Sequence, residues 1–553
     1  MKDFDPVGDL SRTLGDFQHY HKASTWFFRT LHARRVRNQV DALYGPQIAQ
    51  DVVDAIKAGK DHRGVLERAE RARKAQKERD DLLTSPPPIH GSGRWADESE
   101  IGNQLKGREA LDNPRSIVLG TFQGQSGPRF FHWDEEGHLL TLAPTRSGKG
   151  VTAIIPNLLR YKGSAVVLDP KGELYAATSK WRRENVGPVY RLAPFDDGTN
   201  PTTANFIRSS YNPLARVRSQ SDARALAELM FPADPRASAF FIEDAVAFVT
   251  ATILYVKKKC PEPLRHLGTV RRFLAAPLDD FRALASLMAG LDDMPSVQEA
   301  ATNVLGKDRG KALPTLRDTL NAKLSLWSDD GIYQTCSQHD FDFEDLKDRP
   351  ATVYLDVPFD LMTPYAPWLK VILRSALSAM TRNPTRPDIP VLFVLDEFLS
   401  LGSYPEFRDA IRTHAGAGVR LWFFLQDEGA LREHYPQDAW RPFFNCSVKQ
   451  FFGVDDPMTG GLVGSYLGQT TVAYRSFSGN RDLSAEPSDS VELTGRPLLT
   501  PDEVMELLSG WTGRGIRQSI LQVRGLRPTK LHLTEYSLSP SLKERAGAYT
   551  VGE

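Results

Sequence analysis

Short apolar runs recur in two separated parts of the chain, and turn-forming or charged residues bound each of them. Such runs predict buried strands, because a strand that is covered on both faces needs no polar alternation. Helical periodicity fills several of the intervening segments, as at about 152–160. The order strand, loop, helix, strand is typical of a parallel sheet covered by helices. The predicted strands are 116–121, 139–142, 165–168, 351–355, 391–395, 421–425 and 448–452.

A long segment without strand signals separates the two parts. From about Arg218 to Trp327 the apolar positions, mainly alanine and leucine, follow a helical period, which predicts an all-α domain inserted into the α/β domain. Helical patterns also fill the chain up to about Leu83, and the proline run at 84–88 ends that segment because proline cannot continue a helix. The expected domains are an N-terminal helical segment (1–88), the first part of the α/β domain (89–217), the all-α insert (218–340), the second part of the α/β domain (341–535) and a C-terminal tail (536–553).

The N-terminal segment carries two kinds of helical pattern. Residues 64–81 mix Glu, Arg, Lys and Ala, which usually indicates a solvated helix face. Residues 26–36 place aromatic side chains beside basic ones; this stretch is either an ordinary helix or one that lies on a membrane surface or a partner.

The most apolar run, 245–256, predicts a buried helix, because crossing a bilayer takes about 20 residues. We expect no membrane span.

The charge balance and the cysteine spacing indicate which kinds of binding site the chain can have. Lys and Arg together number 69, as do Asp and Glu, so no overall positive field indicates a nucleic-acid partner. A basic surface would have to be local or built from several subunits. The three cysteines, Cys260, Cys336 and Cys446, lack the paired spacing of disulfide frameworks or thiolate metal sites. This pattern favours a reducing cytoplasm.

A glycine loop joins the strand at 139–142 to the helix that follows. Such a loop directs backbone N–H groups and the positive end of a helix dipole at phosphate oxygens. Two positions depart from the usual phosphate-binding motif: Ala143 replaces its first glycine, and Gly150 replaces the hydroxyl that contacts magnesium. The alternative is a simple helix-start turn. The residues expected to bind the nucleotide are Pro144, Thr145, Arg146, Ser147, Gly148, Lys149, Gly150 and Val151.

Polar residues also follow two later strands. Asp396 and Glu397 end the strand at 391–395, as in a Walker B segment; we expect Asp396 to hold Mg²⁺ directly or through water and Glu397 to polarise the attacking water. Gln426 ends the strand at 421–425 and is expected to sense the γ-phosphate of ATP. In an open parallel sheet these residues converge on the crevice beyond the carboxyl ends of the strands, together with Lys149 of the glycine loop. The alternative is that they only terminate buried strands.

A series of matching stretches between about residue 90 and residue 533 resembles the TraG/TraD-type coupling ATPases of conjugation and type IV secretion. Glycine loops that end in Gly-Lys-Gly are usual in the TraG-like branch, so Gly150 is a family trait, whereas Ala143 is a mild departure. Thr152 is a poor substitute for the missing hydroxyl, because it points to nearly the opposite face of the helix. The matching stretches are HGSGRWADESEI from His90, APTRSGKGVTAIIPNLL from Ala143, GSAVVLDPKGELY from Gly163, YNPLA from Tyr211, VLFVLDEFLSLG from Val391, GAGVRLWFFLQDEGALREHYPQDAW from Gly416, FFGVDDPMTGGLVGSYLGQTT from Phe451 and GRPLLTPDEV from Gly495.

The resemblance implies a RecA-like P-loop domain with an inserted all-α domain. It also implies a ring motor, usually a homo-hexamer, that uses ATP and Mg²⁺ to pass relaxase-bound single-stranded DNA or secreted proteins to a type IV secretion channel. The turn at 169–173 matches a family motif near the nucleotide, although by itself it is only a charged Pro-Gly turn. An arginine finger from a neighbouring subunit is expected, and Arg412, Arg420, Arg432 and Arg441 are its candidates.

The chain departs from the family at its N-terminal segment, because family members commonly begin with transmembrane helices. We therefore expect a cytoplasmic protein that a small membrane partner recruits to the inner membrane through the N-terminal helices. Two other functions stay open. One is a cytoplasmic DNA-translocating ring ATPase of the FtsK/HerA type. The other is a nucleotide-gated cargo adaptor with little hydrolysis, which the substitutions at Ala143 and Gly150 make conceivable and the Asp396-Glu397 pair opposes.

Overall fold

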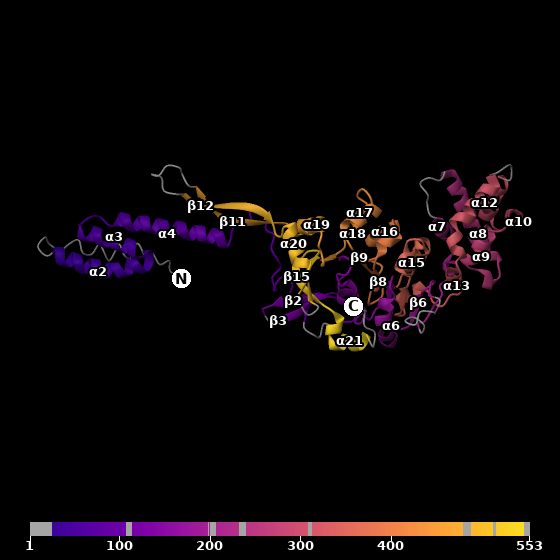
Figure 1. Ribbon diagram of the computed structural model, residues 1–553, viewed down its shortest axis with the longest axis horizontal. Coiled ribbons are helices and arrows are strands. Elements are labelled where there is room, and N and C mark those ends of the chain that lie inside the picture. The colour runs from indigo at the N-terminus through magenta and orange to yellow at the C-terminus, as the bar shows by residue number, and fades with distance from the viewer. Residues whose placement is uncertain are drawn as a thin grey trace. The chain divides into compact units, whose positions relative to one another are not determined.

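The computed structural model describes residues 25–106, 113–125, 127–196, 198, 206–231, 239–307, 312–478, 488–512 and 516–546. The predicted N-terminal segment, insert and tail therefore lie partly outside the described residues. The chain divides into two compact units: Met1–Gly93 with Leu467–Leu498, and Arg94–Tyr466 with Leu499–Glu553. Figure 1 labels the elements of both units.

In the described part of the first unit the helices are α2 (Thr25–Tyr44), α3 (Pro46–Lys57) and α4 (Arg63–Thr84). The buried side chains of α3 recur every three or four residues, which places them on one face of the helix. As predicted, α4 ends where the proline run begins. Among the described helices, none combines the length and the apolar character needed to cross a bilayer. The core of this unit consists of Ala33, Val36, Val40, Ala49, Val52, Val53, Ile56 and Leu66.

A β-hairpin belongs to the first unit. Strands β11 (Gln469–Ser478) and β12 (Ser488–Pro497) pair along their whole length. The backbone N–H of His90 donates to the Thr471 hydroxyl at 3.0 Å, and Arg475 forms an ion pair with Asp80 of α4 at 3.3 Å. The hairpin lies within the segment 341–535 that we expected in the α/β domain, but its contacts group it with the N-terminal helices.

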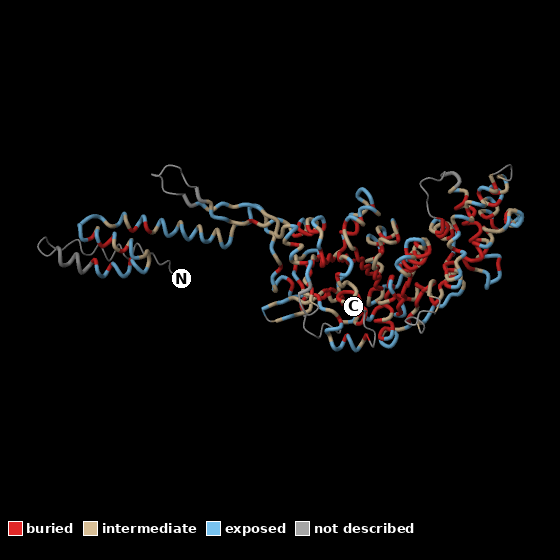
Figure 2. The backbone as a smooth tube through the Cα atoms, in the orientation of Figure 1, coloured by how far each residue is buried: buried red, intermediate tan, exposed pale blue. Residues whose placement is uncertain are grey.

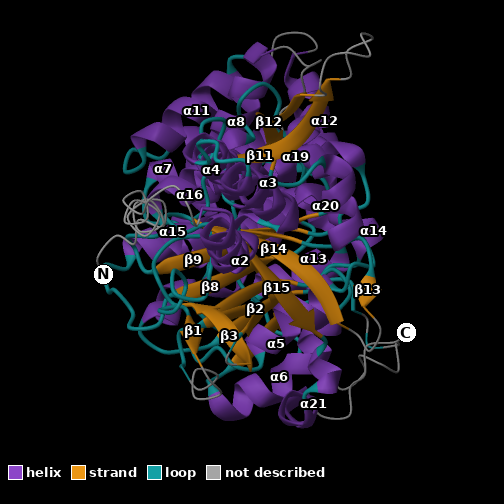
Figure 3. Ribbon diagram, turned by 90° about the vertical axis from the view of Figure 1, so that its left-hand side faces the viewer, coloured by secondary structure: helices purple, strands orange, loops and turns teal. Residues whose placement is uncertain are grey.

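One large sheet organises the second unit (Figure 3). Its strand order is β1-β3-β2-β15-β14-β10-β4-β9-β8-β5-β7-β6, and β13 pairs with β14. The strands from β10 to β6 are parallel, whereas β14, β15, β2, β3 and β1 extend the sheet by antiparallel pairing. Every predicted strand is confirmed, with small differences at the ends. The strands are β1 Leu105–Lys106, β2 Ile117–Gly124, β3 Gly127–Trp133, β4 Leu139–Leu142, β5 Ala165–Leu168, β6 Val189–Leu192, β7 Thr352–Leu355, β8 Val391–Leu395, β9 Val419–Leu425, β10 Val448–Phe451, β13 Trp511–Thr512, β14 Ile516–Val523 and β15 Thr529–Thr534.

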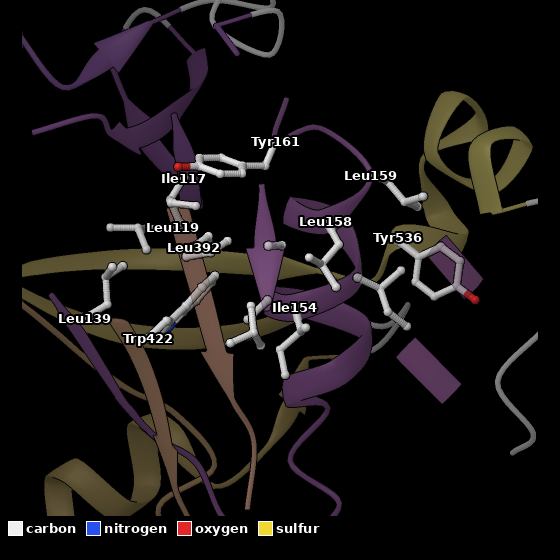
Figure 4. Packing of buried hydrophobic residues seen from close by; sticks show 14 of the residues in the cluster. Ile117, Leu119, Leu139, Ile154, Leu158, Leu159, Tyr161, Leu392, Trp422 and Tyr536 are labelled. Carbon is white, nitrogen blue, oxygen red and sulfur yellow. The ribbon is translucent and has the colours of Figure 1, made fainter. Parts of the chain in front are cut away.

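The central strands are buried on both faces, which explains their continuous apolar runs (Figure 2). In β9, Trp422 and Phe424 belong to the core cluster that also contains Leu158 (Figure 4). Their neighbour Phe423 points to the other face and contacts Phe407 and Phe443. The helices and helical turns around the sheet are η2 Gly150–Ile154, α5 Ile155–Leu158, α6 Glu173–Asn185, α14 Phe359–Met362, α15 Ala366–Arg382, η7 Phe398–Leu401, α16 Pro405–Thr413, α17 Glu428–His434, α18 Arg441–Phe444, α19 Pro457–Leu467 and α20 Pro501–Leu508.

The segment predicted as an all-α insert is helical throughout its described residues, apart from connecting turns. In α8 the apolar run predicted to be a buried helix has Phe248, Val249, Ile253 and Val256 fully covered, which confirms that prediction. These helices gather beyond α15 in Figure 1. They are α7 Gln220–Met230, α8 Ala239–Lys259, α9 Leu267–Leu274, α10 Leu278–Ala289, α11 Pro295–Leu305, α12 Ala312–Lys323 and α13 Asp330–Ser337.

The described residues from 536 to 546 pack onto the core of the large sheet. Residues that we expected to form a tail make the turn η8 (Tyr536–Leu538) and the helix α21 (Pro540–Ala546). Leu542 and Ala546 lie four residues apart, on one face of α21, and are buried with Tyr536 in the cluster drawn in Figure 4. This segment is thus part of the second unit.

Candidate nucleotide site

The glycine loop lies at the carboxyl end of β4. The backbone N–H of Ala143 donates to Leu425 of β9 at 2.8 Å, which fixes the start of the loop against the neighbouring strand. Arg146 (φ 61°) and Gly148 (φ 82°) adopt left-handed backbone conformations, which are costly for a residue with a side chain such as Arg146. The loop then enters the π-helical turn η2, a rare geometry that is frequent at functional sites.

Lys149 contacts both predicted acidic residues. Its Nζ lies 3.2 Å from Asp396 Oδ1 and also forms a short ion pair with Glu397 Oε1. The exposed fractions of the three side chains are only 14–16%, so solvent screens these charges little. Residues separated by almost 250 positions therefore meet beyond the ends of β4 and β8.

Gln426 extends this network to β9. Its Nε2 donates to Glu397 Oε2 at 2.6 Å, while its Oε1 accepts from the Thr145 hydroxyl at 3.0 Å. Thr145, Gln426, Glu397 and Lys149 thus form one hydrogen-bonded chain. The contact of Thr145 with Gln426 is one that sequence reasoning missed, because the loop motif says nothing about side chains on a neighbouring strand.

The backbone at Glu397 is strained. This residue has φ 53° and is the only described residue between β8 and η7 in the left-handed region. A non-glycine residue persists in this conformation only where the surrounding structure holds it, and such residues cluster at functional sites. The carboxylate of this residue contacts Lys149.

The electrostatics of the site follow from two carboxylates that share one ammonium group. Burial lowers the pKa of Lys149, but Asp396 and Glu397 outweigh it and raise the pKa overall. Burial raises the pKa of Asp396; Glu397 raises it further, and Lys149 opposes both. With all three groups ionised the cluster carries one net negative charge.

The site has features that fit a magnesium ion. Carboxylate oxygens are the ligands that Mg²⁺ prefers, and the uncompensated negative charge favours a cation. Apart from its chain neighbours and the local helix backbone, no atom lies within 4 Å of the position that a Cβ on Gly150 would take, so water has room where related loops place a hydroxyl. Thr152 does not fill that role, because its hydroxyl donates to the Gly148 carbonyl at 2.9 Å.

A second buried charge network lies farther along the same edge of the sheet. Arg191 of β6 pairs with Asp196 at 2.6 Å, and its Nε donates to Asp356, which follows β7, at 2.7 Å. Asp169, which follows β5, accepts the backbone N–H of Tyr175 at 2.7 Å. Burial, with a contribution from Asp356, raises the pKa of Asp169 to about 8. Sequence reasoning singled out the turn at Asp169 but not its charged neighbours, which lie far away in the sequence.

The arginine-finger candidates differ in their surroundings. Arg420 is buried, donates to the backbone carbonyls of Arg115 and Glu135 at 2.8 Å each, and stacks on Trp133. It sits near the start of β9, at the end of the strand remote from the nucleotide site, and is therefore a structural residue. Arg432 pairs with Glu428 on its own helix.

The amino-acid sequence matches a known protein family. A family model described as type IV secretory system conjugative DNA transfer matches residues 94–552. The chain belongs to this family. Protein VirD4 of Rhizobium rhizogenes is 29% identical over 462 residues, which cover 81% of this chain and 65% of that protein. Conjugal transfer protein TraG of Escherichia coli is 28% identical over 463 residues, covering 76% and 71%. The chain spans slightly less than two thirds of the length of the VirD4 proteins it matches.

Solved structures of conjugative coupling proteins share the fold. The bacterial conjugative coupling protein TrwBdeltaN70, in its unbound monoclinic form, superposes with a TM-score of 0.54 at 16% identity, covering 80% of this chain and 92% of that one. The plasmid coupling protein TrwB in complex with ADP and Mg²⁺ gives a TM-score of 0.50 at 17% identity, covering 72% and 85%. These likenesses confirm the predicted fold class, a RecA-like α/β domain with an inserted all-α domain.

Proposed function

We propose that this member of the conjugative DNA transfer family is an ATP-hydrolysing coupling protein that delivers DNA, protein or both to a type IV secretion channel. The observation that carries the proposal is the contact of Lys149 with Asp396 and Glu397, and of Glu397 with Gln426. Family membership and the ADP and Mg²⁺ in the TrwB complex support the choice of nucleotide and ion.

Phosphate binding is assigned to the glycine loop. The residues from Pro144 to Val151 surround the start of the helix, where backbone N–H groups and the helix dipole attract anions. Lys149 leaves its carboxylate partners and moves to the β- and γ-phosphate oxygens, which offer it a larger negative charge. Asp396 and Glu397 are then free to act on other groups.

Hydrolysis requires a base beside the γ-phosphate. Released from Lys149, the Glu397 carboxylate accepts a proton from the attacking water, while Gln426 keeps its hydrogen bond to Glu397 and so orients it. Asp396, with water in the space beside Gly150, would hold Mg²⁺. When bound, Mg²⁺ neutralises charge on the phosphate oxygens.

The assembly and partners also belong to the proposal. We infer a homo-hexameric ring in which a neighbouring subunit supplies an arginine, with single-stranded DNA carrying its relaxase, or a secreted protein, as cargo. Since the chain is neutral overall, its basic groups contact DNA only where a ring concentrates them around a channel. A membrane partner that binds the N-terminal helices is proposed to bring this protein to the inner membrane.

Steady-state ATPase assays test the proposal. We expect Lys149→Ala to weaken ATP binding, and Glu397→Gln to keep binding near normal while slowing turnover by about 10²-fold or more. Glu433→Gln removes the same charge from an exposed position on α17 and should leave the rate unchanged. Parent-like turnover by the Glu397→Gln protein would contradict the role of Glu397.

Addition of single-stranded DNA separates a motor from an adaptor. A ring motor should show higher activity per subunit with increasing protein concentration and with DNA, and the DNA effect should weaken as salt screens phosphate contacts. Activity that stays low and indifferent to both would favour the nucleotide-gated adaptor. DNA-stimulated activity that is unaffected by secretion-channel components would favour a cytoplasmic translocating ring.

A further inference from the structure

The glycine loop holds a conformation that is unfavourable for two of its residues. Arg146 has φ 61°, a left-handed backbone that only glycine adopts without cost. The next residue, Ser147, is only 3% exposed, and its hydroxyl has no hydrogen-bond partner among the described residues. A buried hydroxyl without a partner has lost its bonds to water and gained none. Because such features persist only where the surrounding structure imposes them, another part of the chain must hold this loop.

The residue that lies behind Ser147 is Gly453, two positions after the end of β10. Gly453 has φ 70°, and a Cβ built on it would lie 2.6 Å from the Cβ of Ser147 and 3.5 Å from the Cδ of Pro144. Two carbon atoms that are not bonded pack at about 3.5–4.0 Å, so alanine at position 453 requires the loop to move. The bare backbone of Gly453 is therefore a close wall against the middle of the glycine loop.

Two backbone hydrogen bonds fix this wall. The N–H of Phe452 donates to the carbonyl of Leu142, the last residue of β4, at 3.2 Å. The N–H of Gly453 donates to the carbonyl of Leu508, the last residue of α20, at 2.9 Å. Arg517 of β14 also donates to the Leu508 carbonyl, at 3.4 Å. The position of Gly453 is thus set by hydrogen bonds to β4 and α20.

The helix α20 is itself held by close packing against α19, the helix that follows Gly453. A Cβ built on Gly460 of α19 would lie 2.9 Å from the carbonyl oxygen of Pro501, and one built on Gly464 would lie 3.0 Å from that of Leu499. The two helices therefore touch through their backbones, with no flexible side chain between them at these points. The carbonyl of Leu508 is accordingly a fixed acceptor for Gly453.

We propose that Gly453 is a positioning residue of the nucleotide site: its backbone keeps Ser147 buried and so keeps the loop N–H groups open to phosphate. The inference rests on the proposed function, in which these N–H groups bind the phosphates. A side chain at position 453 displaces Ser147, and the loop then relaxes toward an ordinary turn. The sequence pattern assigned no role in the site to this glycine.

Limited digestion of the full chain with trypsin tests the contact without any nucleotide. Arg146 is exposed, so cleavage after it reports how often the loop opens. Gly453→Ala should speed this cleavage by about tenfold, as expected for overpacking of a close contact. Equal rates of cleavage after Arg146 in the Gly453→Ala protein and the parent would overturn the inference.

Gly525→Ala, in the turn between β14 and β15, is the matched control. Gly525 has φ 83°, so alanine meets the same kind of backbone cost there as at Gly453. Apart from its two chain neighbours, no atom of the described chain lies within 4 Å of a Cβ built on Gly525. The Gly525→Ala protein should therefore show the cleavage rate after Arg146 and the ATP affinity of the parent.

Titration calorimetry with ATP and Mg²⁺ gives a second test. Gly453→Ala should weaken ATP binding by about tenfold or more. Ser147→Gly removes the Cβ that alanine at position 453 would meet, so in that background the loss of affinity caused by Gly453→Ala should be at least about threefold smaller. Equal losses in the two backgrounds would show that the two residues act independently and would overturn the inference.

Ser147→Val introduces the same crowding from the side of the loop, and it serves where the Gly453→Ala protein does not fold. It should weaken ATP binding and speed cleavage after Arg146, each by about tenfold; parent-like values of both would overturn the inference. Failure of the parent to bind ATP would instead contradict the proposed function. The trypsin assay, which needs no nucleotide, still decides in that case whether Gly453 holds the loop.

Discussion

Gln426 Nε2 donates a hydrogen bond to Glu397 Oε2 at 2.6 Å, between the ends of the adjacent strands β9 and β8. The other oxygen of Glu397 is held by Lys149. In the proposed function, where the lysine moves to phosphate, the glutamine is the contact that keeps this carboxylate in place, and the pair links phosphate sensing to the orientation of the base.

Replacement of Gln426 should impair turnover more than binding. Gln426→Ala removes the donor to Glu397, and we expect kcat to fall by about 10- to 100-fold with little change in KM for ATP. Gln426→Glu places a second carboxylate against Glu397 and should lower kcat at least as far. Gln338→Glu, at an exposed position before β7, is the control for added charge. Unchanged kcat in the Gln426→Ala protein would refute the orienting role.

A hydroxyl introduced at residue 150 should be tolerated. Because nothing lies within 4 Å of a Cβ built on Gly150, Gly150→Ser fits sterically and supplies the ligand that related loops use. The Mg²⁺ concentration for half-maximal ATPase activity should then fall, as measured by magnesium titration. Gly148→Ser should instead lose activity, since φ 82° costs a side chain about 1–2 kcal/mol. If Gly150→Ser is inactive while still folded, the space beside Gly150 has another use.

The buried carboxyl of Asp169 should make stability depend on pH. Its pKa is raised from 3.8 to about 8, so between these values the folded chain binds a proton that the unfolded chain has released. Stability should therefore be greatest at the acidic end of this window and fall as pH rises toward 8, by up to about 1.4 kcal/mol per pH unit. Urea unfolding from pH 5 to 8 measures this slope.

Asp169→Asn is the variant that isolates this group, because an amide oxygen can still accept the Tyr175 N–H. We expect a smaller loss of stability between pH 5 and 8 than in the parent. Asp279→Asn, whose side chain is 94% exposed, should keep the parent slope. Equal slopes in the parent and the Asp169→Asn protein would show that Asp169 is ionised in the folded chain.

Arg420 should behave as a structural residue and not as an arginine finger. Arg420→Met removes the donor to two backbone carbonyl groups and the guanidinium that stacks on Trp133, so we expect a clearly lower thermal midpoint by calorimetry. Arg412→Met, at an exposed position on α16, should change the midpoint little. A stable Arg420→Met protein that fails only in assembly-dependent ATP hydrolysis would reverse this assignment.

The parallel part of the sheet could be predicted because its strands are buried on both faces. The runs at β4, β5 and β8 coincide with the predicted residues. Because parallel strands share one carboxyl edge, the sequence also predicted that Lys149, Asp396, Glu397 and Gln426 lie close together. The alternation of Trp422 and Phe423 between opposite faces shows why apolar residues dominate these runs.

Among the antiparallel strands β2 was predicted, but the others could not be predicted in the same way. In the β11–β12 hairpin most side chains are partly or fully exposed, so polar and apolar residues mix without the continuous run that marks a core strand. The strands β14 and β15 mix buried and accessible positions along their length. Their place in the sheet depends on pairing with β10 and β2, and these partner strands lie far away in the sequence.

The ion pairs of Lys149 have a consequence for the release of product. A nucleotide binds here only if its phosphate oxygens replace Asp396 and Glu397 as the partners of Lys149. The binding free energy is therefore the difference between the contacts that the lysine makes with phosphate and those that it makes with the two carboxylates. In the proposed function, ATP competes well through its γ-phosphate, whereas ADP offers the lysine fewer oxygens and the carboxylates recapture it more easily. On that proposal the same three side chains favour binding of the triphosphate and release of the diphosphate.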